Sequence, residues 1–307
     1  MSKHYCGALL LAFLWTGAPL FAADKPKAGK GALGQGTRGT QDTAAKVNLR
    51  YKFTPGETLE TEVVHRTKVK TTVQGTTQTA ESQSTSVKVW KITDVTDEGT
   101  VTFDHMVARV EMWQRTSGRQ KVRYNSDTDT KVPPGYEHVA EAVGVPVSTV
   151  TMSARGKIIT RKEHRDQPMG VSTQMTMPLP ERRIAIGESW SSPLEIDVAR
   201  KDGSIKKIQT RQKFTLGKVA DGVATIKVDS QVLTPVHDPA IEAQLIQRLS
   251  QGTVRFDIDS GRVLSQQLDL DRHVIGFSGA ASSMHYVTRF TEKLIRPSEK
   301  TARRPEE

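Results

Sequence analysis

The sequence predicts a mainly β protein with large antiparallel sheets or half-barrels and two short helices. Long runs of alternating polar and apolar residues, rich in valine and threonine, are typical of half-buried strands. Glycine-containing turn signals join these runs into hairpins. Helix start signals are confined to two segments. With 36% hydrophobic residues among 307, the chain has enough apolar material for a core, which excludes wholesale disorder.

The alternation is clearest in the first third of the folded region. One strand is predicted over residues 63–73, followed by a turn at Gln74-Gly75 and a returning strand over residues 79–95. A third strand is predicted over residues 100–113, after the acidic-glycine turn that ends at Gly99. Similar patterns along the rest of the chain bring the expected total to roughly a dozen strands.

The clearer of the two helices begins at Asp238, an N-cap residue followed by proline at the first helical position. Its apolar residues have helical spacing, and Gly252 is expected to end it. The second helix is predicted over residues 136–143, between proline- and glycine-rich segments. The apolar stripe of the first helix consists of Ile241, Leu245, Ile246 and Leu249.

The order of elements repeats along the chain and predicts an internal duplication. Each half opens with a Gly-Glu turn, at Gly56 and at Gly187. Each continues with a hairpin around an acidic-glycine turn, a helix, and a hairpin whose turn combines glycine with a basic residue. The predicted halves are residues 47–166 and residues 167–295.

Both ends of the chain differ in composition from this region. Residues 1–23 have the features of a secretory signal, with Lys3 before a short apolar run and small residues before the expected cleavage site. Residues 24–46 and 296–307 are expected to be a disordered linker and a disordered tail. We therefore expect a periplasmic or secreted protein that is not an integral membrane protein after signal cleavage. Cleavage would also remove Cys6, the only cysteine.

Short motifs in both halves resemble known families. The openings of the halves, at residues 49–57 and 186–190, and the hairpin at residues 256–263 are similar to uncharacterised exported bacterial β-sheet families. More distantly, the arrangement resembles the carrier half-barrels of bacterial lipoprotein transport, in which short helices close a curved antiparallel sheet over an apolar cavity. The resemblance implies export and β architecture, and it assigns no catalytic residue.

Local motifs for catalysis or metal binding are absent from the sequence. None of the eight histidines lies three to five residues from another, and no zinc-protease, P-loop or dinucleotide-binding motif occurs. A metal site assembled from distant residues stays open. We therefore assign no catalytic, cofactor-binding or metal-ligating residue, and we expect a protein that is not an enzyme.

Two functions agree best with these features, and an enzyme whose site is assembled from scattered residues stays a third alternative. The first is an exported, non-enzymatic binding protein of the cell envelope for an apolar or lipid-like ligand, with the stripe Ile241, Leu245, Ile246 and Leu249 lining a cavity; the same stripe also fits plain core packing. The second is a surface protein that binds an anionic glycan or envelope polymer. The net charge of +10 agrees with an anionic partner, but missing aromatic interleaving argues against nucleic acid. Its expected anion-binding residues are Lys206, Lys207, Arg211 and Lys213.

Overall fold

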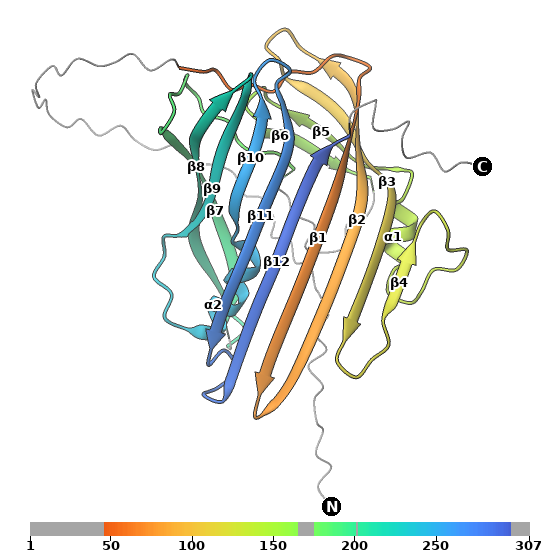
Figure 1. Cartoon of the computed structure of the whole chain (residues 1–307), viewed down its shortest axis with the longest axis vertical. Coiled ribbons are helices and arrows are strands. Elements are labelled where there is room, and N and C mark those ends of the chain that lie inside the picture. Colours follow the sequence, from red (N-terminus) through yellow and green to blue (C-terminus); the bar gives the residue numbers. More distant parts are fainter. Residues whose placement is uncertain (1–45, 165–174, 201, 296–307) are drawn as a thin grey trace, which may run out of the picture.

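The structure is a computed structural model that describes residues 46–164, 175–200 and 202–295. The predicted signal, all but the last residue of the predicted linker, and the predicted tail lie outside the described residues. The described chain forms twelve strands, two α-helices and one 3-10 helix (Figure 1). The elements are β1 (Thr58–Val73), β2 (Thr76–Val95), β3 (Val101–Thr116), β4 (Val122–Asn125), α1 (Glu137–Ala142), β5 (Pro146–Met152), β6 (Ile158–Glu163), β7 (Ser189–Ala199), β8 (Ile205–Ala220), β9 (Val223–Val232), α2 (Pro239–Leu245), η1 (Ile246–Arg248), β10 (Gln251–Asp257), β11 (Arg262–Ile275) and β12 (Ser282–Leu294).

All twelve strands belong to one antiparallel sheet, which confirms the predicted fold class. The strand order is β6-β5-β3-β2-β1-β12-β11-β10-β9-β8-β7, and β4 pairs with β3 beside β5. The first and last strands of the chain are therefore neighbours at the centre of the sheet. The sheet is open, because β6 and β7 end it and are not paired with each other.

The two halves run through this sheet in the same direction and share local details. The order β7-β8-β9-α2-β10-β11 matches β1-β2-β3-α1-β5-β6. In the two opening turns, the backbone N–H of Gly56 donates to the carbonyl of Ile92 at 3.0 Å, and that of Gly187 donates to Leu216 at 2.7 Å. A β-bulge follows Ile92 and another follows Leu216. Matching bulges and turns of this kind are expected if the two halves arose by the predicted duplication.

The sheet is strongly curved, and the helices lie on its concave side, which we call the inner face (Figure 1). The helix α2 begins at Asp238, whose carboxylate accepts a hydrogen bond from the backbone N–H of Ala240 at 2.9 Å, as the sequence predicts. It packs on β7 through Ile241 and on β11 through Ala243. The helix α1 lies over Tyr124. Both helices thus cover one end of the inner face.

The other end of the inner face is filled by two connecting segments, residues 47–53 and 175–185, which we call the straps. Leu49 of the first strap and Ile184 of the second lie in the main core, where they join side chains of β3 and β5 to side chains of β8, β9 and β10. The straps bond to each other through Val47 and Ile184. They therefore connect the two arms of the curved sheet from inside.

Two glycines allow the straps to lie directly on hairpin turns. Gly261, with φ of +67°, sits so close to the first strap that an added Cβ would lie 2.6 Å from the backbone nitrogen of Lys52. Gly156, with φ of +80°, is equally close to the second strap, at 2.7 Å from the carbonyl oxygen of Met177. Only glycine fits both the left-handed backbone and this close approach.

Candidate ligand site on the inner face

A pocket opens on the inner face where the straps meet β1, β2, β11 and β12. Its enclosed part is small, about 60 Å³, and it continues into a mouth that is open to solvent. The pocket therefore has room for part of a ligand and does not enclose a whole lipid. The residues that line it are Tyr51, Phe53, Leu59, Thr61, Trp90, Met175, Thr176, Met177, Arg262, Val263, Leu264, Gln266, Glu292 and Leu294.

Aromatic side chains form one wall of the pocket. Tyr51 and Phe53 stack with ring centroids 6.2 Å apart, and Phe53 lies 6.3 Å from the ring of Trp90. Trp90 in turn stacks on Phe103 of the main core at 4.4 Å. Because each ring is supported by the next, the wall presents a preformed apolar surface.

Most polar side chains of the pocket wall have partners within the protein, although the buried Nε of Arg262 has none among the described residues. The hydroxyl of Tyr51 donates a hydrogen bond to the carbonyl oxygen of Met177 at 3.0 Å, and burial raises the pKa of this phenol, so it stays neutral. Arg262 forms an ion pair with Glu57 at 2.6 Å, and both side chains are about four-fifths buried. The amide of Gln266 donates to a carboxylate oxygen of Glu292. The pocket therefore presents a mainly apolar surface.

Beside the pocket lies a polar cluster formed by His65, Lys88, His105, Ser148 and Arg161. The strand register places these residues on the inner face: Trp90 pairs with His105, and His105 pairs with Ser148. Trp90, which lines the pocket, is thus a direct cross-strand neighbour of the cluster.

Two members of this cluster are buried without hydrogen-bond partners. His105 is 7% exposed and Ser148 is 0% exposed. Neither ring nitrogen of His105 nor the hydroxyl of Ser148 has a partner in the part of the chain that the structure describes. Buried polar groups are almost always paired, so an orphaned pair on facing strands marks a place for a polar ligand group or water.

The cluster has a basic character. Burial, followed by the charges of Lys88 and Arg161, lowers the pKa of His105 to about 3. Burial and the charge of Lys88 also lower the pKa of His65. Arg161 pairs with Glu163 at 2.5 Å, whereas Lys88 lies over the ring of Phe290 and has no carboxylate within ion-pair distance among the described residues. An anionic group near Lys88 would favour the charged form of these imidazoles and so raise their pKa values.

The stripe that was expected to line a cavity packs elsewhere. Ile241 and Leu245 contact the core between α2, β7 and β8, whereas Ile246 and Leu249 contact β1, β11 and β12. None of the four is among the residues that line the pocket. Their role in the structure is to hold the helix on the sheet.

The four expected anion-binding residues do not share one face of β8. Lys207, Arg211 and Lys213 all point to the outer, convex face, because they lie an even number of residues apart on β8. Lys206 points to the inner face. Lys207 forms an ion pair with Glu195 at 2.5 Å, and Lys213 lies opposite Asp229. Acidic neighbours thus reduce the positive charge of this strand.

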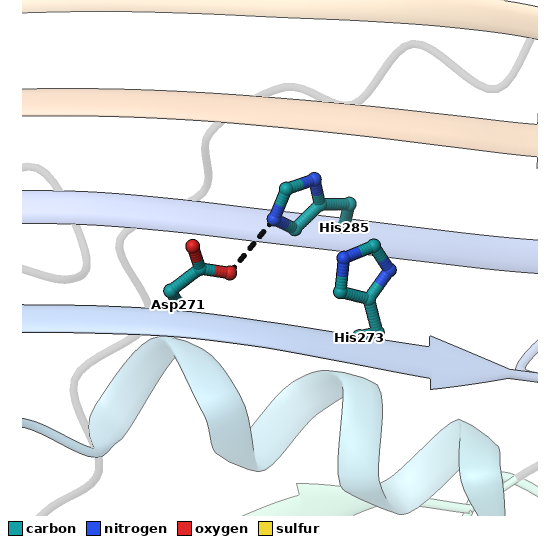
Figure 2. Close-up of side chains that lie close together, drawn as sticks. All are labelled: Asp271, His273 and His285. Atoms are coloured by element: carbon teal, nitrogen blue, oxygen red, sulfur yellow. Dashed lines mark hydrogen bonds and ion pairs between the residues drawn. The ribbon is translucent and has the colours of Figure 1, made fainter.

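The outer face carries a cluster that sequence spacing did not reveal. Asp271 and His273 lie two residues apart on β11, and His285 lies directly opposite His273 on β12 (Figure 2). The Nε2 atom of His285 is 2.8 Å from a carboxylate oxygen of Asp271, and the two imidazole rings stack at 3.8 Å. A hairpin turn predicted at residues 276–281 would have placed His273 opposite His285 and so have indicated this cluster.

Comparisons with known proteins give a family and two distant structures. A model of a family of unknown function, DUF6263, matches residues 170–271. A lipovitellin structure, titled for its lipid-protein interactions, has a TM-score of 0.45 and 13% identity and covers 80% of this chain. The matched region is 26% of that chain, so this protein spans about a quarter of it. DynF of the dynemicin biosynthesis pathway of Micromonospora chersina has a TM-score of 0.21 and 8% identity, over 86% of this chain and 95% of that one.

No curated protein matches the chain. Among the described residues, no helix has the length and apolar character needed to cross a membrane. The expected resemblance to an uncharacterised β-sheet family is confirmed: the chain is similar to the family of unknown function over residues 170–271.

Proposed function

We propose that the protein is an exported, non-enzymatic binding protein of the cell envelope whose inner face holds a lipid-like ligand with an acidic headgroup. One observation carries the proposal: the apolar pocket lies next to the buried basic cluster. Trp90 lines the pocket and is the cross-strand neighbour of His105 in the cluster. An amphiphile with an acyl chain and a carboxylate or phosphate has both of the matching chemistries. Export rests on the signal features of residues 1–23.

The apolar end of such a ligand would lie against the aromatic wall and the methionines Met175 and Met177. Flexible thioether side chains adapt to chains of varied shape. Each methylene removed from water contributes about 0.8 kcal/mol, so a few of them supply useful affinity. Because the pocket is open, the rest of the ligand can extend along the inner face toward the cluster.

The acidic end would lie between Lys88, His105 and Ser148. The lysine supplies a charge, and the hydroxyl and one ring N–H supply hydrogen bonds. An anion at this position stabilises the imidazolium form, so it would raise the pKa of His105 from its low value of about 3. Ligand binding is then coupled to proton uptake, and affinity rises as the pH falls, for as long as the fold persists.

The test compares oleate with oleyl alcohol, which has the same chain without the charge, by titration calorimetry on the full chain. We expect oleate to bind about tenfold tighter, and Lys88→Met to remove that difference. The matched control is Lys213→Met, on the outer face of β8, which should leave both affinities unchanged. Equal affinities for the two ligands in the unaltered protein would contradict the acidic headgroup, and binding of neither would contradict the pocket.

A further inference from the structure

We propose that Asp271, His273 and His285 form a binding site for a transition-metal dication of the Zn²⁺ type on the outer face. The site lies on the opposite side of the sheet from the ligand pocket and is independent of it. Two imidazoles and one carboxylate form a ligand set that suits Zn²⁺, Cu²⁺ or Ni²⁺. Figure 2 shows the three side chains turned toward one another above the two strands.

The sheet holds the three side chains in place. Asp271 and His273 point to the same side because they are two residues apart on β11. His285 is fixed opposite His273 by the continuous β11–β12 register, which runs without a bulge from Ser265 to Ile275. The backbone therefore preorganises the three ligands, and only side-chain rotation is needed for binding.

The spacing fits a metal ion after a small rearrangement. One ligand atom from each residue lies within 4.8 Å of the other two. Ligand atoms around a tetrahedral Zn²⁺ are about 3.4 Å apart, which follows from bonds of about 2.1 Å. The stacked rings must turn so that each plane contains the ion. Asp271 and His273 are exposed, so both side chains have room to rotate on their solvent side.

No arginine or lysine of the described residues forms an ion pair with Asp271, so its carboxylate is available to a cation. Asp269, on the same face of β11, is already paired with Arg289 at 2.6 Å. The hydrogen-bond partner of Asp271 is His285. Lys70 of β1 lies opposite His285 and is exposed, so its ammonium can extend into solvent away from a bound ion. The carboxylate therefore offsets part of the charge of a dication.

The experiment titrates Zn²⁺ alone into the full chain and follows the heat of binding. We expect one ion per chain, with affinity at least about tenfold weaker in His273→Gln and in His285→Gln, and a smaller loss in Asp271→Asn. The control is His138→Gln, an exposed histidine of α1. Lys88→Met should leave Zn²⁺ binding unchanged, which separates this site from the ligand site.

A second measurement identifies the ligands directly. The electron paramagnetic resonance spectrum of the bound Cu²⁺ should show coupling to two imidazole nitrogens, and only one after His285→Gln. Circular dichroism verifies that each variant is folded. Failure of Zn²⁺ to bind, or Zn²⁺ binding that survives both histidine substitutions, would overturn the proposal.

Discussion

Histidines lie on both faces of the sheet, but their surroundings differ. Those on the inner face are buried beside a lysine, and those on the outer face lie beside a carboxylate. On the inner face, His65 and His105 are desolvated beside Lys88, and their pKa values are lowered. On the outer face, His273 and His285 are stacked within reach of a carboxylate and of solvent. The pleat of a strand separates neighbouring side chains to opposite faces, so one sheet can offer an anion site inside and a cation site outside.

The largest expected effect comes from lifting a strap off the inner face. In Gly261→Ala, the new Cβ would be 2.6 Å from the first strap, at a residue with positive φ. We expect the free energy of unfolding to fall by about 2–4 kcal/mol and oleate binding to be lost, while Zn²⁺ binding persists. Urea denaturation and calorimetry measure these changes.

The matched control is Gly118→Ala, in the turn between β3 and β4. It also has positive φ, but nothing lies within 4 Å of its added Cβ, so only the backbone strain remains. An equal loss of stability in both variants, or intact oleate binding in Gly261→Ala, would contradict the role of the strap.

The second effect is acid destabilisation through His105. Its pKa is about 3 in the folded protein against an ordinary value of 6.5, so the unfolded chain takes up a proton first as the pH falls. The stability contribution is fully present above pH 6.5 and declines as the pH falls from 6.5 toward 3. Between pH 7 and pH 5 this one group should lower the free energy of unfolding by about 2 kcal/mol.

The variant His105→Leu removes this titration and should flatten the pH dependence by that amount. It should also keep or raise stability at pH 7, because it replaces an unpaired buried polar group with an apolar one. Oleate binding should nevertheless weaken. An unchanged pH profile would show that His105 titrates normally in the folded protein.

The smallest effect distinguishes the two halves of the sheet. Glu57 and Glu188 occupy the same position in the two opening turns, and each pairs with an arginine. The pair of Glu57 is mostly buried, so Glu57→Gln should lower the free energy of unfolding by about 1–2 kcal/mol. Glu188→Gln, whose partner Arg182 is exposed, should have a smaller effect in the same urea titration. Equal effects would contradict the assigned difference in burial.

The sequence pattern predicted most elements because each has a local cause, but the predicted end of helix α2 at Gly252 was wrong. The helix ends at Leu245, and Gly252 lies within β10. Alternating valines determine β1, and Asp238 with Pro239 begins α2. The pattern could not show that β1 pairs with β12, because sheet order depends on contacts far apart in the chain. The site of His105 and Ser148 depends on the β3–β5 register, which helix α1 interrupts in sequence, so the orphaned pair was missed.

The pocket was missed for a related reason. Its wall combines Phe53 of one strap with Met175 and Met177 of the other, and straps have no periodic pattern to follow. The apolar stripe of α2 was the more visible signal, but it is used to pack the helix on the sheet. Regular hydrophobic spacing reports burial, and it does not distinguish a cavity wall from a core.

The most direct test of the ligand site uses a brominated fatty acid, because bromine quenches tryptophan fluorescence only at close contact. Trp90 lines the pocket on the inner face, whereas Trp113 lies on the outer face under Lys121. The account predicts saturable quenching that persists in Trp113→Phe and is largely lost in Trp90→Phe. Quenching that is unchanged in Trp90→Phe would contradict a ligand in this pocket, because Trp190, the other inner-face tryptophan of the described residues, does not line it. Quenching that disappears in Trp113→Phe would contradict a ligand site on the inner face.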